Sequence, residues 1–297
     1  MKILIQSACV LATLLLGAPP AFGGDPEHVA RIREAVAFDQ KLGADLDLSL
    51  AFLDEEGRAV KLGDYFGRKP VLVTPVYFGC PQLCTQVLTG LVNGLKEMSL
   101  EPGRDFEIVT FSINPLEKPE LAREKKAAYL ELLGKPDAAA AWHFLTADPA
   151  RNVAPKSTEN PNATDPDAWH NPSVDALTAS LGFRYAYDPE IQQYAHAAGV
   201  VVATPEGKSS KYLYGIHFLP RDLRLSIVDS SNGKVGSLAD QLFLWICYHY
   251  DPLSGKYSFA VVNTVRACAV LTVLALIAYV VIHLRRERVT ARLQAGG

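Results

Sequence analysis

A continuous apolar run, PVLVTPVYF at residues 70–78, leads into a turn with two cysteines and then into a segment with helical periodicity. An apolar run of this length is typical of a strand that is buried on both faces. After the turn, apolar residues recur with the spacing of one helix face, at positions 87, 88, 91, 92, 95 and 98. The sequence therefore predicts a buried strand, a turn that carries Cys80, and a helix packed on the sheet.

The alternation of strands and helices continues along the chain, which indicates one α/β domain of sandwiched layers over residues 46–247. Residues 148–172 are rich in Pro, Asn and Asp and lack periodicity, so we interpret them as an inserted surface loop. The other expected elements are a lead-in helix over 24–45, a hairpin turning at Glu56–Gly57, strands at 106–114 and 142–147, helices at 115–134, 173–183 and 220–232, and a hairpin turning at Glu206–Gly207.

The N-terminal segment, residues 1–23, has the layout of a secretory signal. One lysine precedes an apolar run at 3–16, and the helix breakers Pro19 and Pro20 come before small residues. An uncleaved anchor is the alternative, but the run is short for a membrane crossing. We expect cleavage near Gly23.

A second apolar segment, residues 259–284, contains Arg266 as its only formal charge. It is long enough to cross a bilayer, and an arginine cluster opens the following tail, residues 285–297. A buried core helix is the alternative interpretation. The positive-inside rule predicts a single-pass protein of the inner membrane, with a cytoplasmic C-terminus and its main domain on the extracytoplasmic side.

Composition limits the partners and the role of the cysteines. A net charge of -3 does not suggest a nucleic-acid partner. Of five cysteines, Cys9 lies in the signal, Cys268 in the apolar segment and Cys247 in an aromatic stretch just before it. Cys80 and Cys84 remain as a close pair. In an oxidising compartment such a pair tends to become a disulfide unless a reductant or a metal intervenes.

The spacing of Cys80 and Cys84 leaves several chemistries open. If Cys84 lies in the first helical turn, both sulfurs can reach the helix N-terminus, where the positive dipole end favours thiolates. A disulfide, a redox couple, a metal clamp and two buried thiols are all compatible with this spacing. A metal site needs a third ligand, and two thiolates with one imidazole would favour copper over hard cations. The candidate histidines are His28, His143, His170, His196, His217 and His249.

Three stretches together resemble the SCO/SenC family: PVLVTPVYFGCPQLC, TFSINP and YAHAAGVVVATPEGKSSKYLYG. The resemblance covers roughly residues 45–245. It implies a thioredoxin-like fold with a central mixed sheet flanked by helices, here followed by one C-terminal transmembrane helix. The family's histidine stands nine residues before the proline of a hairpin turn, which selects His196 ahead of Pro205 and not His217. The implied copper ligands are thus Cys80, Cys84 and His196.

The resemblance also implies a function. Such a chain would be a membrane-tethered copper chaperone that helps to build the binuclear copper centre of cytochrome c oxidase. Its partners would be the copper-bearing oxidase subunit and, as a further candidate, another copper chaperone. The alternative is a thiol-disulfide reductase, with Cys80 attacking a client disulfide and Cys84 resolving it. Two departures from the family pattern are Ala195, where Asp is frequent, and Asn114 before Pro115.

Overall fold

The computed structural model of the protein describes residues 26–80, 82–153, 169–188, 191, 193–236, 250–251, 256–257 and 266–281. The predicted signal at 1–23, the tail at 285–297 and the centre of the inserted loop lie outside these ranges.

A seven-stranded mixed sheet forms the centre of the domain, in the order β10-β9-β4-β5-β6-β2-β3. Its middle strands β4, β5 and β6 are parallel, whereas β9 pairs antiparallel with β4 and β2 pairs antiparallel with β6. In chain order the strands are β2 (Ala51–Leu53), β3 (Ala59–Lys61), β4 (Val71–Val76), β5 (Glu107–Ser112), β6 (Trp142–Ala147), β9 (Gly199–Ala203) and β10 (Ser209–Tyr214).

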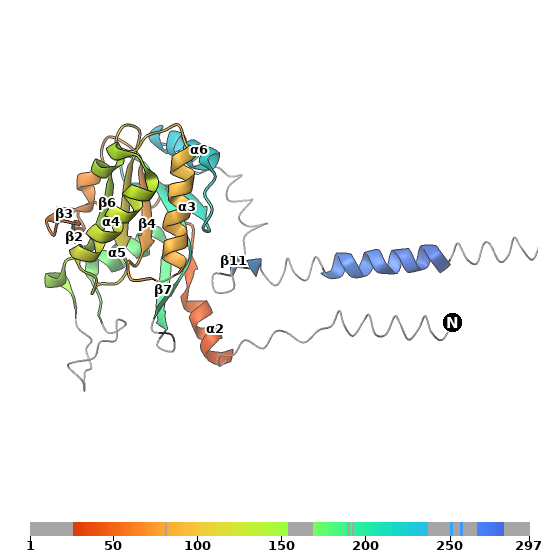
Figure 1. Cartoon of the computed structure of the whole chain (residues 1–297). Coiled ribbons are helices and arrows are strands. Elements are labelled where there is room, and N and C mark those ends of the chain that lie inside the picture. Colours follow the sequence, from red (N-terminus) through yellow and green to blue (C-terminus); the bar gives the residue numbers. More distant parts are fainter. Residues whose placement is uncertain are drawn as a thin grey trace, which may run out of the picture.

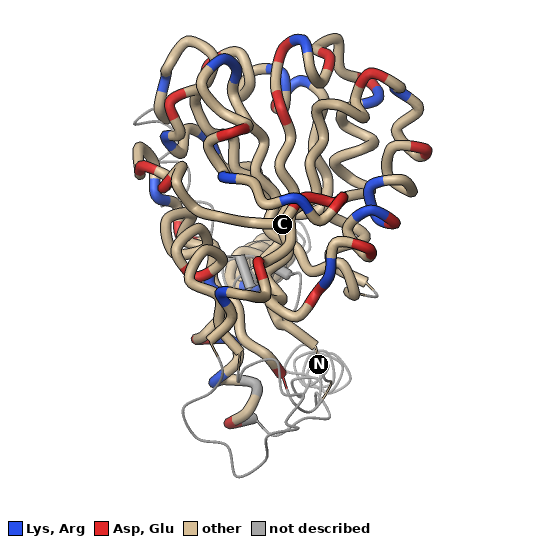
Figure 2. The backbone as a smooth tube through the Cα atoms, turned by 90° about the vertical axis from the view of Figure 1, so that its left-hand side faces the viewer, with Lys and Arg blue, Asp and Glu red and all other residues tan. Residues whose placement is uncertain are grey.

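The predicted central strands are present, and burial on both faces explains their sequence. All residues of β4 and β9 are buried, as are five of the six in β5 and in β6. Figure 2 shows most of the charged residues on outer loops and helices, while the strands in the middle are mostly uncharged. A strand enclosed by helices on both sides must be apolar on both faces, because neither face meets water.

Helices cover the sheet, with α3 and α4 side by side in front of it in Figure 1. Helix α6 packs on β9 and β10 and also touches α3. The helices are α2 (Pro26–Ala35), α3 (Leu83–Glu97), α4 (Pro119–Leu133), α5 (Pro172–Leu181) and α6 (Pro220–Ser231), and short 3-10 turns occur at Leu62–Tyr65, Pro136–Ala140 and Pro149–Arg151. The α/β class with a mixed sheet flanked by helices is confirmed, and the arrangement fits a thioredoxin-like fold.

A close approach of the chain explains two glycines of α3. A Cβ atom at Gly90 would lie 1.8 Å from the carbonyl oxygen of Ile216, and one at Gly94 would lie 2.5 Å from that of Phe218. Helix α3 therefore packs directly against the backbone that follows β10. This contact fixes the helix whose first turn carries Cys84.

A smaller three-stranded sheet, β1-β7-β8, was not predicted from the sequence. Its strands are β1 (Ala37–Phe38), β7 (Phe183–Asp188) and β8 (Gln193–His196), all antiparallel. The helix predicted over 24–45 is correspondingly too long, because α2 ends at Ala35 and the chain becomes extended. The Phe38 ring explains the change, since it packs edge-on against Phe183 and Tyr212 with ring centroids 5.1 and 5.4 Å apart.

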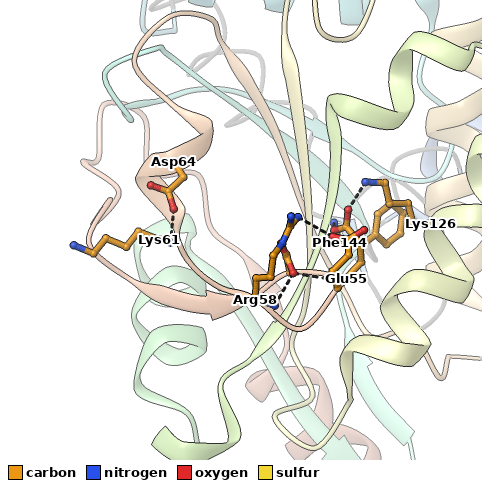
Figure 3. A network of polar contacts seen from close by, with 8 residues as sticks. Glu55, Arg58, Lys61, Asp64, Lys126 and Phe144 are labelled. Atoms are coloured by element: carbon orange, nitrogen blue, oxygen red, sulfur yellow. Dashed lines mark hydrogen bonds and ion pairs between the residues drawn. The ribbon is translucent and has the colours of Figure 1, made fainter.

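The hairpin β2–β3 at the edge of the sheet is held by a polar network (Figure 3). Glu55 is buried, forms an ion pair with Lys126 of α4, and accepts a hydrogen bond from the backbone N–H of Phe144 in β6 at 3.1 Å. In the turn of the hairpin, the Asp54 carboxylate accepts a 2.7 Å bond from the guanidinium of Arg58. Glu55 thus satisfies a strand amide at the point where β2 stops pairing with β6.

The C-terminal apolar segment is described in part. Residues 266–281 are helical, and large apolar side chains on this helix are exposed, among them Leu271 and Tyr279. Within the described ranges, no helix combines the length and the apolar character that a membrane crossing requires.

Candidate metal centre

The first half of the site is the turn that joins β4 to α3. After Val76 the chain turns through Tyr77, Phe78 and Gly79, and the N–H of Cys80 bonds back to the carbonyl oxygen of Tyr77 at 3.3 Å. Helix α3 begins at Leu83, so Cys84 lies in its first turn, which is the condition under which both sulfurs can reach the helix N-terminus. The side chain of the N-cap residue makes no capping bond, and the Cys80 sulfur instead accepts the N–H of Cys84 at 3.4 Å.

The second half of the site is the end of β8, where His196 lies. Strand β9 pairs antiparallel with β4, and Val73 is opposite Val201. In an antiparallel pair, the residues before the start of one strand lie beside the residues after the end of the other. The chain just ahead of β9 is therefore brought beside the turn that follows β4. This topology places His196 against the cysteines across 112 residues of sequence.

The three predicted donors come together in the structure. The Sγ atom of Cys84 lies 3.0 Å from the Nε2 atom of His196, and the ligand atoms of Cys80, Cys84 and His196 all lie within 4.8 Å of one another. All three residues are buried, with 6%, 3% and 4% of their surface exposed. These residues could hold one metal ion.

The orientation of the imidazole suits a ligand. The Nδ1 atom of His196 lies 2.7 Å from the carbonyl oxygen of Ala197, and because a carbonyl only accepts, Nδ1 carries the proton and donates it. The Nε2 atom then presents a lone pair to the sulfurs. A hydrogen bond of this kind from the distal ring nitrogen is the usual way in which proteins orient a histidine that binds metal.

The two thiols differ in proton affinity. A hydrogen bond from the Cys84 side chain, more than bonds from the backbone N–H groups of Cys84 and Gln82, lowers the pKa of Cys80 to about 3, against the effect of burial. Burial raises the pKa of Cys84 well above the usual value, and the charge on Cys80 adds to this. The pair therefore holds one thiolate at Cys80 and one neutral thiol at Cys84.

Aromatic rings enclose the imidazole. The rings of Tyr77 and Phe183 both lie 6.0 Å from the ring of His196, measured between centroids, and Tyr77 also packs edge-on against Tyr194 at 5.4 Å. An apolar wall keeps water from the sulfurs and holds the imidazole in one orientation.

Glu117 is a neighbour of this site that was not predicted from the sequence. Its carboxylate accepts hydrogen bonds from the backbone N–H groups of Phe78 and Gly79, immediately before Cys80. Glu117 follows β5 and is far from the cysteines in the chain, so no local pattern points to it.

The described histidines other than His196 lie away from the thiols. Their positions are as follows: His28 of α2 beside Asp188, His143 of β6 beside Glu107, His170 beside Asp175, and His217 exposed after β10. His249 lies outside the described residues. The exposed position of His217 agrees with its exclusion as a ligand.

The donor set fits a soft metal ion. Two sulfurs and one imidazole nitrogen, buried behind apolar rings, suit monovalent copper and exclude the oxygen ligands that hard cations require. The same two sulfurs are also close enough for thiol-disulfide chemistry, because they lie within 4.8 Å of each other. The geometry alone is thus compatible with metal binding and with exchange.

No protein-family model matches the chain, and no curated protein matches it. Solved structures do match. A proposed electron transfer protein from Aquifex aeolicus is 19% identical, with a TM-score of 0.52 over 67% of this chain and 98% of that one.

This likeness establishes the fold. Sco proteins are also among the solved structures that the chain resembles, as its motif predicts. The copper-bound ScoI of Arabidopsis thaliana is 15% identical over 65% of this chain and 99% of its own, with a TM-score of 0.45. BsSco, described as a member of the Sco family of cytochrome c oxidase assembly proteins, is 18% identical over 66% and 99%, with a TM-score of 0.46.

Proposed function

We propose that this chain is a copper-binding assembly factor of the SCO/SenC type. It holds copper as cargo through Cys80, Cys84 and His196 and helps to build the binuclear copper centre of cytochrome c oxidase. Its partner is the copper-bearing oxidase subunit, with another copper chaperone as a further candidate partner. The convergence of two buried sulfurs on the unprotonated Nε2 of His196, at 3.0 Å from Cys84, carries this proposal.

Copper transfer requires a site that binds tightly and still exchanges ligands. The thiolate of Cys80 and the thiol of Cys84, which loses its proton on metal binding, supply two soft donors. The imidazole of His196 completes the set from a separate strand. A client that presents its own thiolates can replace the donors one at a time, so the metal moves without entering water.

Metal analysis of the reduced full-length protein tests the proposal. We expect one monovalent copper ion per chain, with sulfur as the main scatterer in its X-ray absorption spectrum. A reduced protein that takes up no sulfur-bound copper would exclude the assembly-factor function as proposed and would favour thiol exchange.

The difference in pKa between the two thiols favours a second function, reduction of client disulfides. The Cys80 thiolate attacks one client sulfur, the client S–S bond breaks, and the other client sulfur leaves as a thiolate. Cys84 then loses its proton and attacks the Cys80 sulfur, which releases the second client thiolate. The client gains two electrons, and the protein is left with a disulfide between Cys80 and Cys84. His196→Ala separates the two functions, since it should weaken copper binding and leave this exchange in place.

We further propose that residues 259–284 tether the domain to the inner membrane, after removal of the signal at 1–23. The length and composition of this segment and the arginines after it support a single crossing with a cytoplasmic tail. Tethering keeps the copper site near a membrane-bound client. Cells that produce only the untethered domain at native levels should lose oxidase activity, and full activity in such cells would count against the tether.

A further inference from the structure

The carboxylate of Glu117 bonds to the backbone of the turn that carries Cys80. Its Oε2 atom accepts the N–H of Phe78 at 2.7 Å and the hydroxyl of Ser112 at 2.5 Å, and its Oε1 atom accepts the N–H of Gly79 at 2.6 Å. Bonds to a charged acceptor are shorter and stronger than bonds between neutral groups. These three bonds join the carboxyl ends of β4 and β5 through one side chain.

The turn depends on this carboxylate because the carbonyl oxygens of the turn do not accept all of its backbone N–H groups. Of its amides, only the N–H of Cys80 bonds within the turn, to the carbonyl oxygen of Tyr77. The N–H groups of Phe78 and Gly79 point instead at Glu117. Phe78 is buried, and a backbone donor that leaves water needs an acceptor, so the N–H of Phe78 requires the carboxylate at this position.

The contact is close as well as polar. A Cβ atom at Gly79 would lie 3.1 Å from the Oε1 atom of Glu117, which is closer than side chains normally approach. A side chain at position 79 would therefore require the carboxylate to shift from its position on the amides by a few tenths of an ångström. The close position of the Glu117 carboxylate therefore depends on the absence of a side chain at Gly79.

Glu117 differs from Glu55, the other carboxylate that accepts backbone amides at a strand end. Glu55 is neutralised by Lys126 (Figure 3), whereas the ion pairs formed by the described residues do not include Glu117. Partial burial of a carboxylate that forms no ion pair with a described residue is unfavourable, and its three hydrogen-bond donors offset part of that cost. The partners of Glu117 are a serine and the amides beside Cys80.

We propose that Glu117 is a positioning residue for the metal centre. It fixes the Phe78–Gly79 turn so that the Cys80 sulfur stays within reach of Cys84 and His196. This inference rests on the proposed copper-binding function. Glu117 acts on the metal through Cys80 and does not contact it.

The test compares Glu117→Gln with Glu55→Gln in the full-length reduced protein. A glutamine at position 117 keeps the shape but offers an amide NH2 to one of the two turn amides, so one bond is lost. Competition with a chromophoric copper chelator should show that Glu117→Gln weakens monovalent copper binding by about tenfold, as supporting residues around metal sites commonly do. Glu55→Gln should lower the melting temperature at least as much and leave copper affinity within about twofold, since it acts away from the site.

Gly79→Ala is a second variant, which disturbs the same contact by placing a Cβ atom close to the Glu117 carboxylate. It should also weaken copper binding. Copper affinity that is unchanged in Glu117→Gln, or that falls equally in Glu55→Gln, would overturn the proposal.

A measurement without metal distinguishes the positioning role of Glu117 from the proposed copper function. Alkylation of Cys80 should be faster in Glu117→Gln than in the wild type and in Glu55→Gln. If the wild type binds no copper but this difference appears, the copper function fails and the positioning role stands.

Discussion

The thiols and the imidazole of the centre belong to two parts of the molecule that are held in place differently. Cys80 and Cys84 follow β4, whose residues are all buried in the seven-stranded sheet. His196 ends the β7–β8 hairpin, where most residues are only partly buried and the sheet has three strands. Regions with fewer buried contacts open more readily. The thiol turn is therefore the fixed half of the site, and the hairpin is the half whose displacement could change the coordination.

The largest expected effect is on the fixed half. Cys84→Ser replaces a soft sulfur by a hard hydroxyl oxygen at the centre of the donor set, and we expect the protein to lose tight copper binding altogether. Metal content after gel filtration measures this. Cys268→Ser is the matched control, because Cys268 is a free, exposed cysteine in the C-terminal helix. One copper per chain retained by Cys84→Ser would show that the fixed half is not where the metal binds.

The pH dependence of alkylation tests the asymmetry within the fixed half. With the pKa of Cys80 lowered to about 3, this residue is already a thiolate at mildly acidic pH. Its alkylation rate in the metal-free protein should change by less than about twofold between pH 5 and 8, whereas an ordinary thiol loses roughly tenfold per unit below its pKa of about 8.5. Cys84, whose pKa is raised, should remain unmodified.

Peptide mapping by mass spectrometry identifies the modified cysteine, and a cysteine in an unstructured peptide provides the reference rate. A Cys80 rate that falls in parallel with the reference would contradict the lowered pKa. Equal labelling of both cysteines would contradict the proposed division into thiolate and thiol.

His196→Ala removes the contribution of the hairpin and leaves both thiols. We expect copper affinity to fall several-fold, because two sulfurs still bind monovalent copper. Both thiols should remain titratable with a thiol reagent. His217→Ala is the control, since this exposed histidine lies outside the site and its loss should leave copper affinity unchanged. Unchanged affinity in His196→Ala would mean that the imidazole is a neighbour of the metal and not a ligand.

The fixed half of the site could be predicted from the sequence, and the hairpin could not. The run ahead of Cys80 is apolar throughout and the helix after it has clear periodicity, so local pattern was sufficient to place both cysteines. In β7 the residues FRYAYD mix charged, aromatic and small side chains, because the strand is only partly buried. Neither a continuous apolar run nor a strict alternation marks such a strand.

His196 itself was selected by family resemblance and not by local pattern. Its approach to Cys84 depends on the antiparallel pairing of β9 with β4, which the sequence does not encode in any short stretch. Glu117 also reaches the site through long-range contacts, since 38 to 39 residues separate it from Phe78 and Gly79 in the sequence. No family motif pointed to it. Long-range polar contacts of this kind depend on tertiary structure, so single-sequence patterns do not reveal them.

The smallest expected effect concerns how the hairpin is docked. The Oδ1 atom of Asp188 in β7 lies 3.0 Å from the Nε2 atom of His28, and the side chain of His28 is largely buried in α2. Asp188→Ala removes the acceptor from a buried donor, which should lower the free energy of unfolding by about 1–3 kcal/mol. Copper affinity should fall by only about twofold, because the thiol turn is untouched and His196 lies at the other end of the hairpin.

Asp188→Asn is the control for this prediction, because its amide oxygen can still accept the bond from His28. Denaturant unfolding of the metal-free protein measures the stability, and chelator competition measures the affinity. A loss of affinity in Asp188→Ala as large as that in His196→Ala would mean that α2 holds the imidazole in position through the hairpin. Unchanged affinity with reduced stability would mean that the aromatic contacts of His196 with Tyr77 and Phe183 are sufficient to hold the ring.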